Sequence, residues 1–450
     1  MPTDTEPTVG PSASADPSGE PGSADLGGEP GSDIADPGLA EAGMVRIGWA
    51  RRGMPVLGLI GERFAAEQSL GGLTIAACLH VTAETAVLVD VLRAGGAQVF
   101  LAASNPLSTQ DDIAAALAAD GAAVVYARAG ADRAAYDEHI HRALDSGPDL
   151  VVDDGGDLVN TLHTQRPELL GAVLGGCEST TTGVIRLRRM ASEGTLAFPA
   201  VAADTTATRL MFDNRYGTGQ SALDGIVRAT NVLLAGKVVV VAGYGPCGTG
   251  IAQRARGLGA QVIVTEVDPV RALDARLQGF RVMPMTAAAR VGELFITATG
   301  SRDVIGAEHM ALMRDGAILC NAGHFDVEVD VRALTDLAVE INRDVRPHTD
   351  EYLLADGRRL LLLADGRIVN LVAAEGNPPT VMDVSFAGQA LVLDWLAREH
   401  GSLRPGVYGV PPAIDDQVAR LALASSGAEI DALTPAQQEY LSSWRLPGPS

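Results

Sequence analysis

The segment 235–270, AGKVVVVAGYGPCGTGIAQRARGLGAQVIVTEVDPV, constrains the fold more than any other part of this chain. An apolar strand precedes Gly243, Gly245 and Gly248, a helix and a second apolar strand follow, and Glu266 ends that second strand. The first glycine permits a tight turn, the second lets a diphosphate approach the backbone, and the third lets the helix pack on the strand. The N–H groups at the helix start can bind the diphosphate, and a carboxylate such as Glu266 accepts the ribose hydroxyls of NAD. A glycine-rich structural turn is the alternative, but this order of strand, helix and acid predicts a Rossmann-type NAD site.

The composition is that of a globular protein with an acidic surface. Its 450 residues carry a formal net charge of −22, which argues against nucleic acid or anionic membranes as partners. No run of about twenty apolar residues occurs, and the N-terminus lacks the basic-then-apolar order of a signal peptide. The four cysteines (Cys78, Cys177, Cys247, Cys320) show no metal-ligand spacing. We therefore expect a cytoplasmic protein with reduced thiols and no metal site.

The chain alternates between strand-like and helix-like runs after a stretch of different composition. Residues 1–42 are rich in Pro, Gly, Ser, Asp and Glu and predict a disordered acidic leader. The runs LTIAACLH, AQVFLAAS, AAVVYARA and PDLVVDDG predict buried parallel strands between alanine-rich helices. We expect an α/β fold in which a Rossmann-type NAD domain is inserted in a second doubly wound α/β substrate domain. The predicted bounds are 43–223 for the substrate domain, 224–376 for the NAD domain with further strands at ELFITATG, AILCNAG and RIVNLVAA, 377–420 for the return to the substrate domain, and 421–450 for a C-terminal tail.

Polar residues that could do chemistry follow the ends of predicted strands. His80 follows the first of these runs, Asp153 and Asp154 follow PDLVV within Asp-Asp-Gly-Gly-Asp, and His324 follows AILCNAG. Each has a plainer interpretation, since an acid at a strand end is often a helix cap. Ligands of open α/β sheets bind beyond the carboxyl ends of the strands, so one cleft could collect all of these residues.

Several strings resemble the S-adenosylhomocysteine hydrolase family over nearly the whole chain after the leader. They include LHVTAETAVLVDVL, NPLSTQD, DDGGDLVNTLHT, TTTGVIRL, FDNRYG, LDGIVRAT, AGYGPCGTG, TEVDP, GHFDVEVDV and RIVNL, in this order along the sequence. The resemblance implies an adenine nucleoside substrate and a redox-assisted elimination. NAD oxidises ribose C3′, the C4′ proton becomes acidic, its loss expels the group on C5′, water adds, and C3′ is reduced again.

The resemblance also implies roles for individual residues. His80 and Asp154 resemble the groups that handle the C4′ proton and the leaving group, and His324 resembles the histidine beside the leaving group. Thr82 and Glu84 resemble adenine contacts. Asp213 and Asn214 resemble the pair beside the C3′ hydroxyl and the nicotinamide. The further residues that resemble NAD contacts are Thr180, Thr181, Thr182, Gly243, Gly245, Gly248, Glu266 and Asn370. Family members form tetramers as pairs of dimers, so we expect a homodimer or homotetramer.

The departures from the family pattern cluster at positions that face the substrate. Arg209 stands where the family has its catalytic lysine, and an arginine stays protonated, which makes it a poor proton acceptor. Ser179 replaces an acid that holds ribose hydroxyls, Thr218 replaces a cysteine, and Asn377 replaces the histidine of the Gly-His-Pro gate. Asp204 replaces an asparagine, and Arg271 replaces an asparagine near the cofactor ribose. The family's C-terminal lysine and tyrosine have no counterpart in SSWRLPGPS.

These departures favour a specialised relative that expels water from a 5′-hydroxyl, a dehydratase of nucleoside natural-product biosynthesis. Ser179 would leave room for a modified sugar in that interpretation. S-adenosylhomocysteine hydrolysis is the alternative, and a non-catalytic NAD-binding regulatory partner is a third interpretation. Arg271 hints at NADP, but Glu266 would repel a 2′-phosphate, so we expect NAD.

Overall fold

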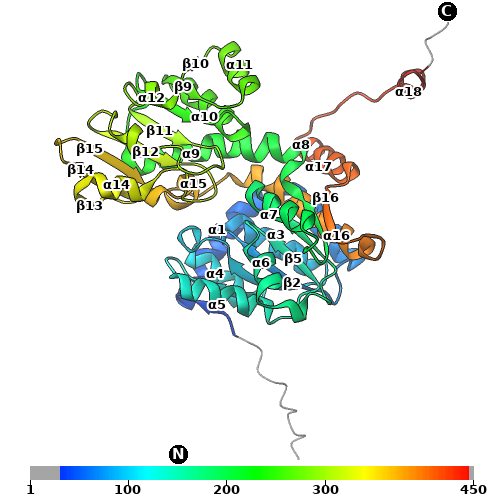
Figure 1. The fold of residues 1–450 in the computed structure, drawn as a ribbon. Helices are drawn as coiled ribbons and strands as arrows, with labels where there is room; N and C mark the ends of the chain where they lie inside the picture. Colours follow the sequence, from blue (N-terminus) through cyan, green and yellow to red (C-terminus); the bar gives the residue numbers. More distant parts are fainter. Residues whose placement is uncertain (1–30, 445–450) are drawn as a thin grey trace, which may run out of the picture. The chain divides into compact units, whose positions relative to one another are not determined.

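The computed structural model describes residues 31–444, and two eight-stranded sheets form the frame of this part of the chain (Figure 1). The first sheet has the order β1-β4-β3-β2-β5-β6-β7-β16, and its strand pairs are parallel. Its strands are β1 (Asp33–Ile34), β2 (Thr74–Leu79), β3 (Gln98–Ala103), β4 (Val124–Ala127), β5 (Leu150–Asp153), β6 (Gly175–Glu178), β7 (Pro199–Ala202) and β16 (Gly406–Gly409). The carboxyl ends of these strands therefore lie along one edge of the sheet.

The second sheet carries the glycine-rich segment and has the order β10-β9-β8-β11-β12-β15-β14-β13. Its strands are β8 (Val238–Ala242), β9 (Gln261–Thr265), β10 (Arg281–Val282), β11 (Leu294–Thr297), β12 (Ala317–Asn321), β13 (Ala338–Arg346), β14 (Thr349–Leu354) and β15 (Arg359–Leu363). The pairs β13–β14 and β14–β15 are antiparallel, and the other pairs are parallel. This is a parallel nucleotide-binding sheet with an antiparallel edge, a common form of mixed sheet.

Helices flank each sheet, as Figure 1 shows. The helices that pack on the first sheet are α1 (Ala40–Arg52), α2 (Pro55–Glu67), α3 (Ala83–Ala94), α4 (Asp111–Ala119), α5 (Arg133–Leu144), α6 (Asp157–Thr164), α7 (Thr181–Ser192), α16 (Pro379–Glu399) and α17 (Pro412–Ser425). The second sheet lies with α9 (Thr218–Thr230), α10 (Pro246–Gly257), α11 (Pro269–Leu277), α12 (Met285–Ala288), α13 (Ala307–Met310), α14 (Val331–Leu337) and α15 (Val369–Val372). Short α8 (Ala207–Arg209) leads into a π-helical stretch at Leu210–Gly217, and α18 (Pro435–Ser442) is the last helix of the described residues.

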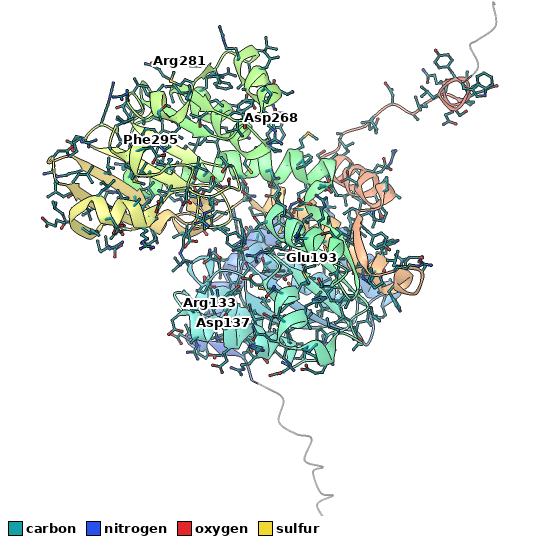
Figure 2. All side chains as sticks on the ribbon, in the orientation of Figure 1. Arg133, Asp137, Glu193, Asp268, Arg281 and Phe295 are labelled. Carbon is teal, nitrogen blue, oxygen red and sulfur yellow. The ribbon has the colours of Figure 1, made fainter. Side chains whose placement is uncertain are left out.

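Each sheet is covered on both faces, which explains the continuous apolar runs in the sequence. Alternate residues of β2 face different clusters: Ile75 and Ala77 belong to one apolar core, and Ala76 and Cys78 belong to another. In the second sheet, Val240 and Phe295 pack in one core, where Phe295 is fully buried (Figure 2). The predicted α/β class is confirmed.

Three local expectations differ from the structure. Regular structure begins before the predicted boundary at residue 42, because β1 pairs with β4 and α1 begins at Ala40; residues 1–30 lie outside the described part. The predicted strand RIVNLVAA is wrong, since Val369–Val372 is the short helix α15. The antiparallel strands β13 and β14 were not expected, because the side chains of β13 are mostly exposed and carry little apolar alternation.

Candidate active site

A cavity of about 1350 Å³ lies where residues after the strands of both sheets meet. It is lined by residues that follow β2, β5 and β6 of the first sheet and β8, β9 and β12 of the second. Every predicted site residue except Gly248 lines it: His80, Thr82, Glu84, Asp154, Ser179, Thr180, Thr181, Thr182, Arg209, Asp213, Asn214, Thr218, Gly243, Gly245, Glu266, His324, Asn370 and Asn377. The volume exceeds that of a single small-ligand pocket, so there is room for a dinucleotide and a second molecule.

His80 directly follows β2, and its imidazole is held from one side. Its Nδ1 lies 2.6 Å from Ser108 Oγ, which itself donates to the backbone oxygen of Asn105. Burial lowers the pKa of His80 to about 4, so the ring is neutral near pH 7. Ser108 Oγ donates its only proton to Asn105, so it accepts a hydrogen bond from His80 Nδ1–H. His80 Nε2 is then the unprotonated, basic nitrogen of the ring.

Three acidic side chains gather where β5 and β6 end. Asp153 accepts from the Val159 N–H at 2.9 Å, Glu178 accepts from the Gly155 N–H at 3.0 Å, and Ser179 Oγ donates to Asp154. Burial raises the pKa of Asp153 to about 7 and raises the pKa of Glu178 well above its usual value. Burial also raises the pKa of Asp154, although the Ser179 hydrogen bond and the charge of Arg209 oppose this. Like charges this close resist joint ionisation, so this group can hold and release a proton near neutral pH.

Arg209 and Asp213 are joined across one helical turn, beside the expected position of the sugar. Arg209 Nη2 lies 3.2 Å from Asp213 Oδ2, and Arg209 Nη1 donates to Ser385 Oγ at 2.9 Å. Ser385, on α16, also donates to Asp213 at 3.3 Å. Asn377 Nδ2 donates to the other oxygen, Asp213 Oδ1. Asp213 is therefore held by three donors, and the Arg209 cation is fixed at the cavity wall.

Asn377 continues this network into the NAD domain. Ser221 Oγ donates to Asn377 Oδ1 at 2.8 Å, and Asn370 Nδ2 donates to Ser221 Oγ at 3.0 Å. The buried Asn370 Oδ1 has no hydrogen-bond partner among residues 31–444. It is an unused acceptor on the cavity wall and suits the carboxamide N–H of a nicotinamide.

The glycines sit as a dinucleotide site requires. Gly243 has φ 93°, and a Cβ there would lie 2.8 Å from the Ala298 carbonyl oxygen. A Cβ at Gly248 would lie 1.9 Å from the Gly243 carbonyl oxygen, so only glycine lets α10 pack on β8. A Cβ at Gly245 would meet only Arg271 Nη1, at 3.6 Å, which leaves open space at the start of α10. Gly248 does not line the cavity, but its close approach to Gly243 shapes the turn that does.

Glu266 closes this site on the ribose side. Its carboxylate accepts from the backbone N–H groups of Tyr244 at 2.7 Å, Val267 at 2.6 Å and Asp268 at 3.0 Å. Asp268 caps the start of α11 (Figure 2). The fixed carboxylate suits two ribose hydroxyls, and the residues present fit NAD.

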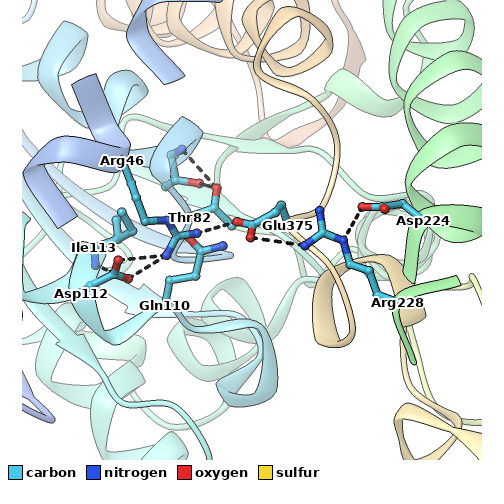
Figure 3. A network of polar contacts seen from close by, with 9 residues as sticks. Arg46, Thr82, Gln110, Asp112, Ile113, Asp224, Arg228 and Glu375 are labelled. Atoms are coloured by element: carbon cyan, nitrogen blue, oxygen red, sulfur yellow. Dashed lines mark hydrogen bonds and ion pairs between the residues drawn. The ribbon is translucent and has the colours of Figure 1, made fainter. Parts of the chain in front are cut away.

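Thr82 and Glu84 begin α3 at the far wall of the cavity. Thr82 caps the helix through the Thr85 N–H, and burial raises the pKa of the Glu84 carboxyl. Arg46 lies nearby and lowers that pKa through its charge. Arg46 also donates to Gln110 at 2.9 Å and to Glu375 at 2.6 Å, next to Gly376-Asn377 (Figure 3).

The network of charged side chains continues from Glu375 to α9, a helix of the second sheet. Glu375 lies 3.8 Å from Arg228 Nη1, and Arg228 pairs with Asp224 at 3.0 Å on α9 (Figure 3). These side chains are half-exposed, so each pair contributes only about 0–1 kcal/mol. These ion pairs matter for position instead, because they hold the segment before Asn377 against both α1 and α9.

Sequence reasoning assigned no role to two residues that hold the site together, Ser108 and Ser385. Ser108 lies within the matched string NPLSTQD, which was the available signal for it. Ser385 lies on α16 and meets Asp213 from 172 positions away, with no local signal in the sequence. Among residues 31–444 no group of histidine, cysteine or acidic side chains is arranged to hold a metal, and no helix is long and apolar enough to cross a membrane.

Fold and site together define a two-domain NAD-dependent enzyme. The family models for S-adenosyl-L-homocysteine hydrolase and for its NAD-binding domain match residues 32–173 and 214–376. The chain belongs to the S-adenosyl-L-homocysteine hydrolase family. It is 56% identical to an adenosylhomocysteinase of Aquifex aeolicus over 92% of this chain and 99% of the relative. It is 54% identical to an S-inosyl-L-homocysteine hydrolase of Methanopyrus kandleri over 91% of this chain and 97% of the relative.

These comparisons test the expectations about family, cofactor and reaction. The family, the Rossmann-type NAD-binding domain and NAD as the cofactor are confirmed. The names of the relatives back the hydrolase alternative better than the dehydratase interpretation, and they lend no support to a role in natural-product biosynthesis.

Proposed function

We propose that this enzyme acts on an adenine nucleoside by oxidation at C3′, removal of the C4′ proton and elimination of the group on C5′. The leading substrate is S-adenosylhomocysteine: homocysteine leaves from C5′, water adds at C5′, and reduction of the C3′ ketone gives adenosine. The observation that carries this proposal is the joint position of His80, Asp154 and His324 in the cavity that also contains the glycine-rich NAD cradle. The names of the similar relatives support the same choice of substrate.

NAD supplies a reversible acceptor for the hydride of C3′. Gly243, Gly245 and the start of α10 would hold its diphosphate, Glu266 its adenosine ribose, and Asn370 with Thr180, Thr181, Thr182 and Asn214 its nicotinamide half. Arg209 stabilises negative charge that develops on the C3′ oxygen, since its guanidinium is fixed at the cavity wall by Asp213 and Ser385. Because arginine stays protonated, it does not accept the hydroxyl proton, which passes instead to the neighbouring carboxylate of Asp213 on the same wall.

His80, His324 and Asp154 handle the C4′ proton and the leaving group in this reaction. Ketone formation at C3′ makes the C4′–H acidic, and a neutral His80 Nε2 or an ionised Asp154 can remove that proton. The C5′ bond to the leaving group then breaks with its electron pair, and a protonated neighbour supplies the proton that the departing sulfur or oxygen needs. Asp154, with its raised pKa, is placed to supply that proton, and the neutral His324 lines the same cavity and can hydrogen-bond the leaving group.

Base recognition rests on Glu84. An ionised Glu84 accepts a hydrogen bond from the exocyclic amine of adenine, whereas a protonated one would donate to the carbonyl of hypoxanthine. Burial favours the protonated form and Arg46 favours the ionised form. A relative of 54% identity carries the name of an inosyl substrate, so inosine derivatives belong in any substrate test.

A dehydratase remains the second candidate, and three contacts favour it. Arg209 stands in the place of the family's lysine and is ion-paired to Asp213. Ser179 is short and spends its hydroxyl on Asp154, where the family has a ribose-binding acid. Asn377 bonds to Asp213 and Ser221 in place of the gate histidine. In this reaction the 5′-hydroxyl leaves as water, and reduction of the ketone leaves an exocyclic 4′,5′-alkene.

One experiment separates these candidates. The purified protein is incubated with S-adenosylhomocysteine and a thiol reagent, and separately with adenosine, inosine and sugar-modified adenine nucleosides analysed by mass spectrometry. Thiol release supports the hydrolase, and loss of the mass of water without thiol release supports the dehydratase. Absorbance at 340 nm reports the oxidation step in both cases. A protein that shows neither product nor any rise at 340 nm is not an enzyme of this type.

We also propose a homodimer or homotetramer, as the family resemblance implies. Light scattering after gel filtration measures the mass, and a monomer at micromolar concentration would contradict this part of the proposal.

A further inference from the structure

Arg186 connects the active-site loops of the two sheets. It lies on α7, and its Nη1 donates to the Gly155 carbonyl oxygen and to Asp157 Oδ1, both at 2.8 Å. Its guanidinium carbon also lies 5.1 Å from the centre of the Phe325 ring, a distance typical of a cation–π contact. Gly155 and Asp157 follow β5 of the first sheet, whereas Phe325 follows β12 of the second. One side chain therefore contacts both loops.

The same contacts fix the position of His324. The rings of His324 and Phe325 lie 4.7 Å apart at 81°, so movement of Phe325 displaces its neighbour. A Cβ at Gly155 would lie 3.1 Å from His324 Nε2, and Gly155 has φ 116°, so only glycine allows this approach. His324 also meets His80 edge-on, with ring centres 5.8 Å apart. His324 is thus enclosed by Phe325, Gly155 and His80.

We propose that Arg186 is a positioning residue that clamps the Gly323-His-Phe-Asp326 loop onto the loop after β5 and thereby holds His324 beside Asp154. The clamp itself is a matter of packing. Its effect on catalysis rests on the proposed function, in which His324 serves the leaving group. Since Arg209 and Asp213 hold the C3′ side separately, the clamp bears on elimination and not on 3′-oxidation.

The charges around His324 agree with this role. His80 and Arg186 face it as cationic or potentially cationic groups, and Asp154 and Asp157 face it as acids. Burial lowers the pKa of His324 to about 4, and the charges of His80 and Arg186 act in the same direction. Asp157 is already paired with Arg186.

The test compares Arg186→Met with Arg186→Lys and with Arg189→Met. Methionine keeps the length and apolar contact with Phe325 but removes the charge and the donors. Lysine restores a cation. Arg189, on the same helix, pairs with Glu193 on the surface at 2.6 Å and is the matched control. All proteins are compared as NAD-bound holoenzymes by hydrogen–deuterium exchange and by kinetics.

In Arg186→Met, we expect amide exchange in peptides covering 323–328 to rise several-fold, with Arg186→Lys intermediate and Arg189→Met unchanged. Elimination should slow by about tenfold or more, as expected when a catalytic group is misplaced, while the 340 nm rise that reports 3′-oxidation stays near wild type. Unchanged exchange at 323–328 would overturn the clamp. An equal loss of oxidation and elimination would show a general structural role and would also overturn it. If the wild-type protein transforms no nucleoside, the proposed function fails, and the exchange measurement still decides whether the clamp exists.

Discussion

The guanidinium of Arg209 lies 3.2 Å from the carboxylate of Asp213, one helical turn further along the chain, and both side chains are largely buried. A lysine at position 209 could lose its proton to become a base, but the guanidinium cannot. In the proposed reaction, Arg209 therefore supplies a fixed positive charge beside the C3′ oxygen and leaves proton transfer to other groups.

Replacing Arg209 with lysine tests this difference. We expect Arg209→Lys to retain 3′-oxidation, because an ammonium still stabilises the oxygen and can also exchange a proton. The rate of the 340 nm rise after addition of adenosine measures the step. The control is Arg215→Lys, since Arg215 lies on the same helical stretch but bonds to Gln253. Complete loss of oxidation in Arg209→Lys alone would show that the geometry of the guanidinium is itself required.

The Asn377 carboxamide leads to a second prediction. Asn377→Asp keeps the shape but places a carboxylate against Asp213 where an N–H donor stood. We expect the free energy of unfolding to fall by roughly 2 kcal/mol at pH 8, the cost of losing a hydrogen bond to a charged group. The loss should be smaller at pH 5, where a shared proton restores a donor. Urea unfolding at both pH values measures the effect, with Asn160→Asp, an exposed site on α6, as the control. An equal loss at both pH values would contradict the assignment.

The sequence predicted the elements whose signals are local. The turn at Gly243 and Gly248 is signalled in the sequence because no other residue fits at these two positions. Strand-end residues such as His80 and Asp154 share a cavity because parallel strands end at one edge. Contacts made by packing gave no such signal. Ser385 reaches Asp213 from α16 only because the chain returns to the first sheet after the NAD domain.

The wrong predictions about the fold also have physical causes. An apolar run such as RIVNL suits a buried strand or a short helix equally, and periodicity does not separate them over so few residues. Asp33 looked like part of a leader by composition. In the structure it is held by Arg128 and by Arg142 and His139 at 3.2 and 3.3 Å, long-range partners that stabilise β1 beside β4.

Cofactor choice gives a third prediction, which concerns Glu266 and Arg271. Arg271 Nη1 lies 3.6 Å from the position of a Cβ on Gly245, near the expected diphosphate, while Glu266 occupies the ribose side. We expect tighter binding of NAD than of NADP, and Arg271→Ala should weaken NAD binding by up to about fivefold, as for an exposed ion pair. Calorimetry on cofactor-stripped protein measures both, and Arg276→Ala on the same helix is the control. If Arg271→Ala weakened only NADP binding, the guanidinium would serve a 2′-phosphate instead.

The buried histidines give the stability of the substrate-free protein a characteristic dependence on pH. The pKa of His80 is about 4 in the folded chain, against an ordinary value of 6.5, so the unfolded chain binds the extra proton first. The His80 contribution is therefore fully present above about pH 6.5 and is lost as the pH falls toward 4, by roughly 2 kcal/mol between pH 7 and 5. Buried acids act in the opposite sense, since the pKa of Asp153 is raised to about 7 and the folded chain then gains protons first.

The two effects are separated by comparing wild type with His80→Asn at each pH. We expect wild type to lose free energy of unfolding relative to this variant as the pH falls from 7 to 5, because only wild type must keep a neutral imidazole buried. The control is His348→Asn, an exposed site with φ 59°, a backbone conformation that asparagine adopts readily. Urea unfolding at half-unit pH steps gives the curves. A difference between wild type and His80→Asn that stays constant across this range would mean that His80 binds protons equally in the folded and unfolded chain, so that burial does not lower its pKa and does not hold it as a neutral base for the C4′ proton.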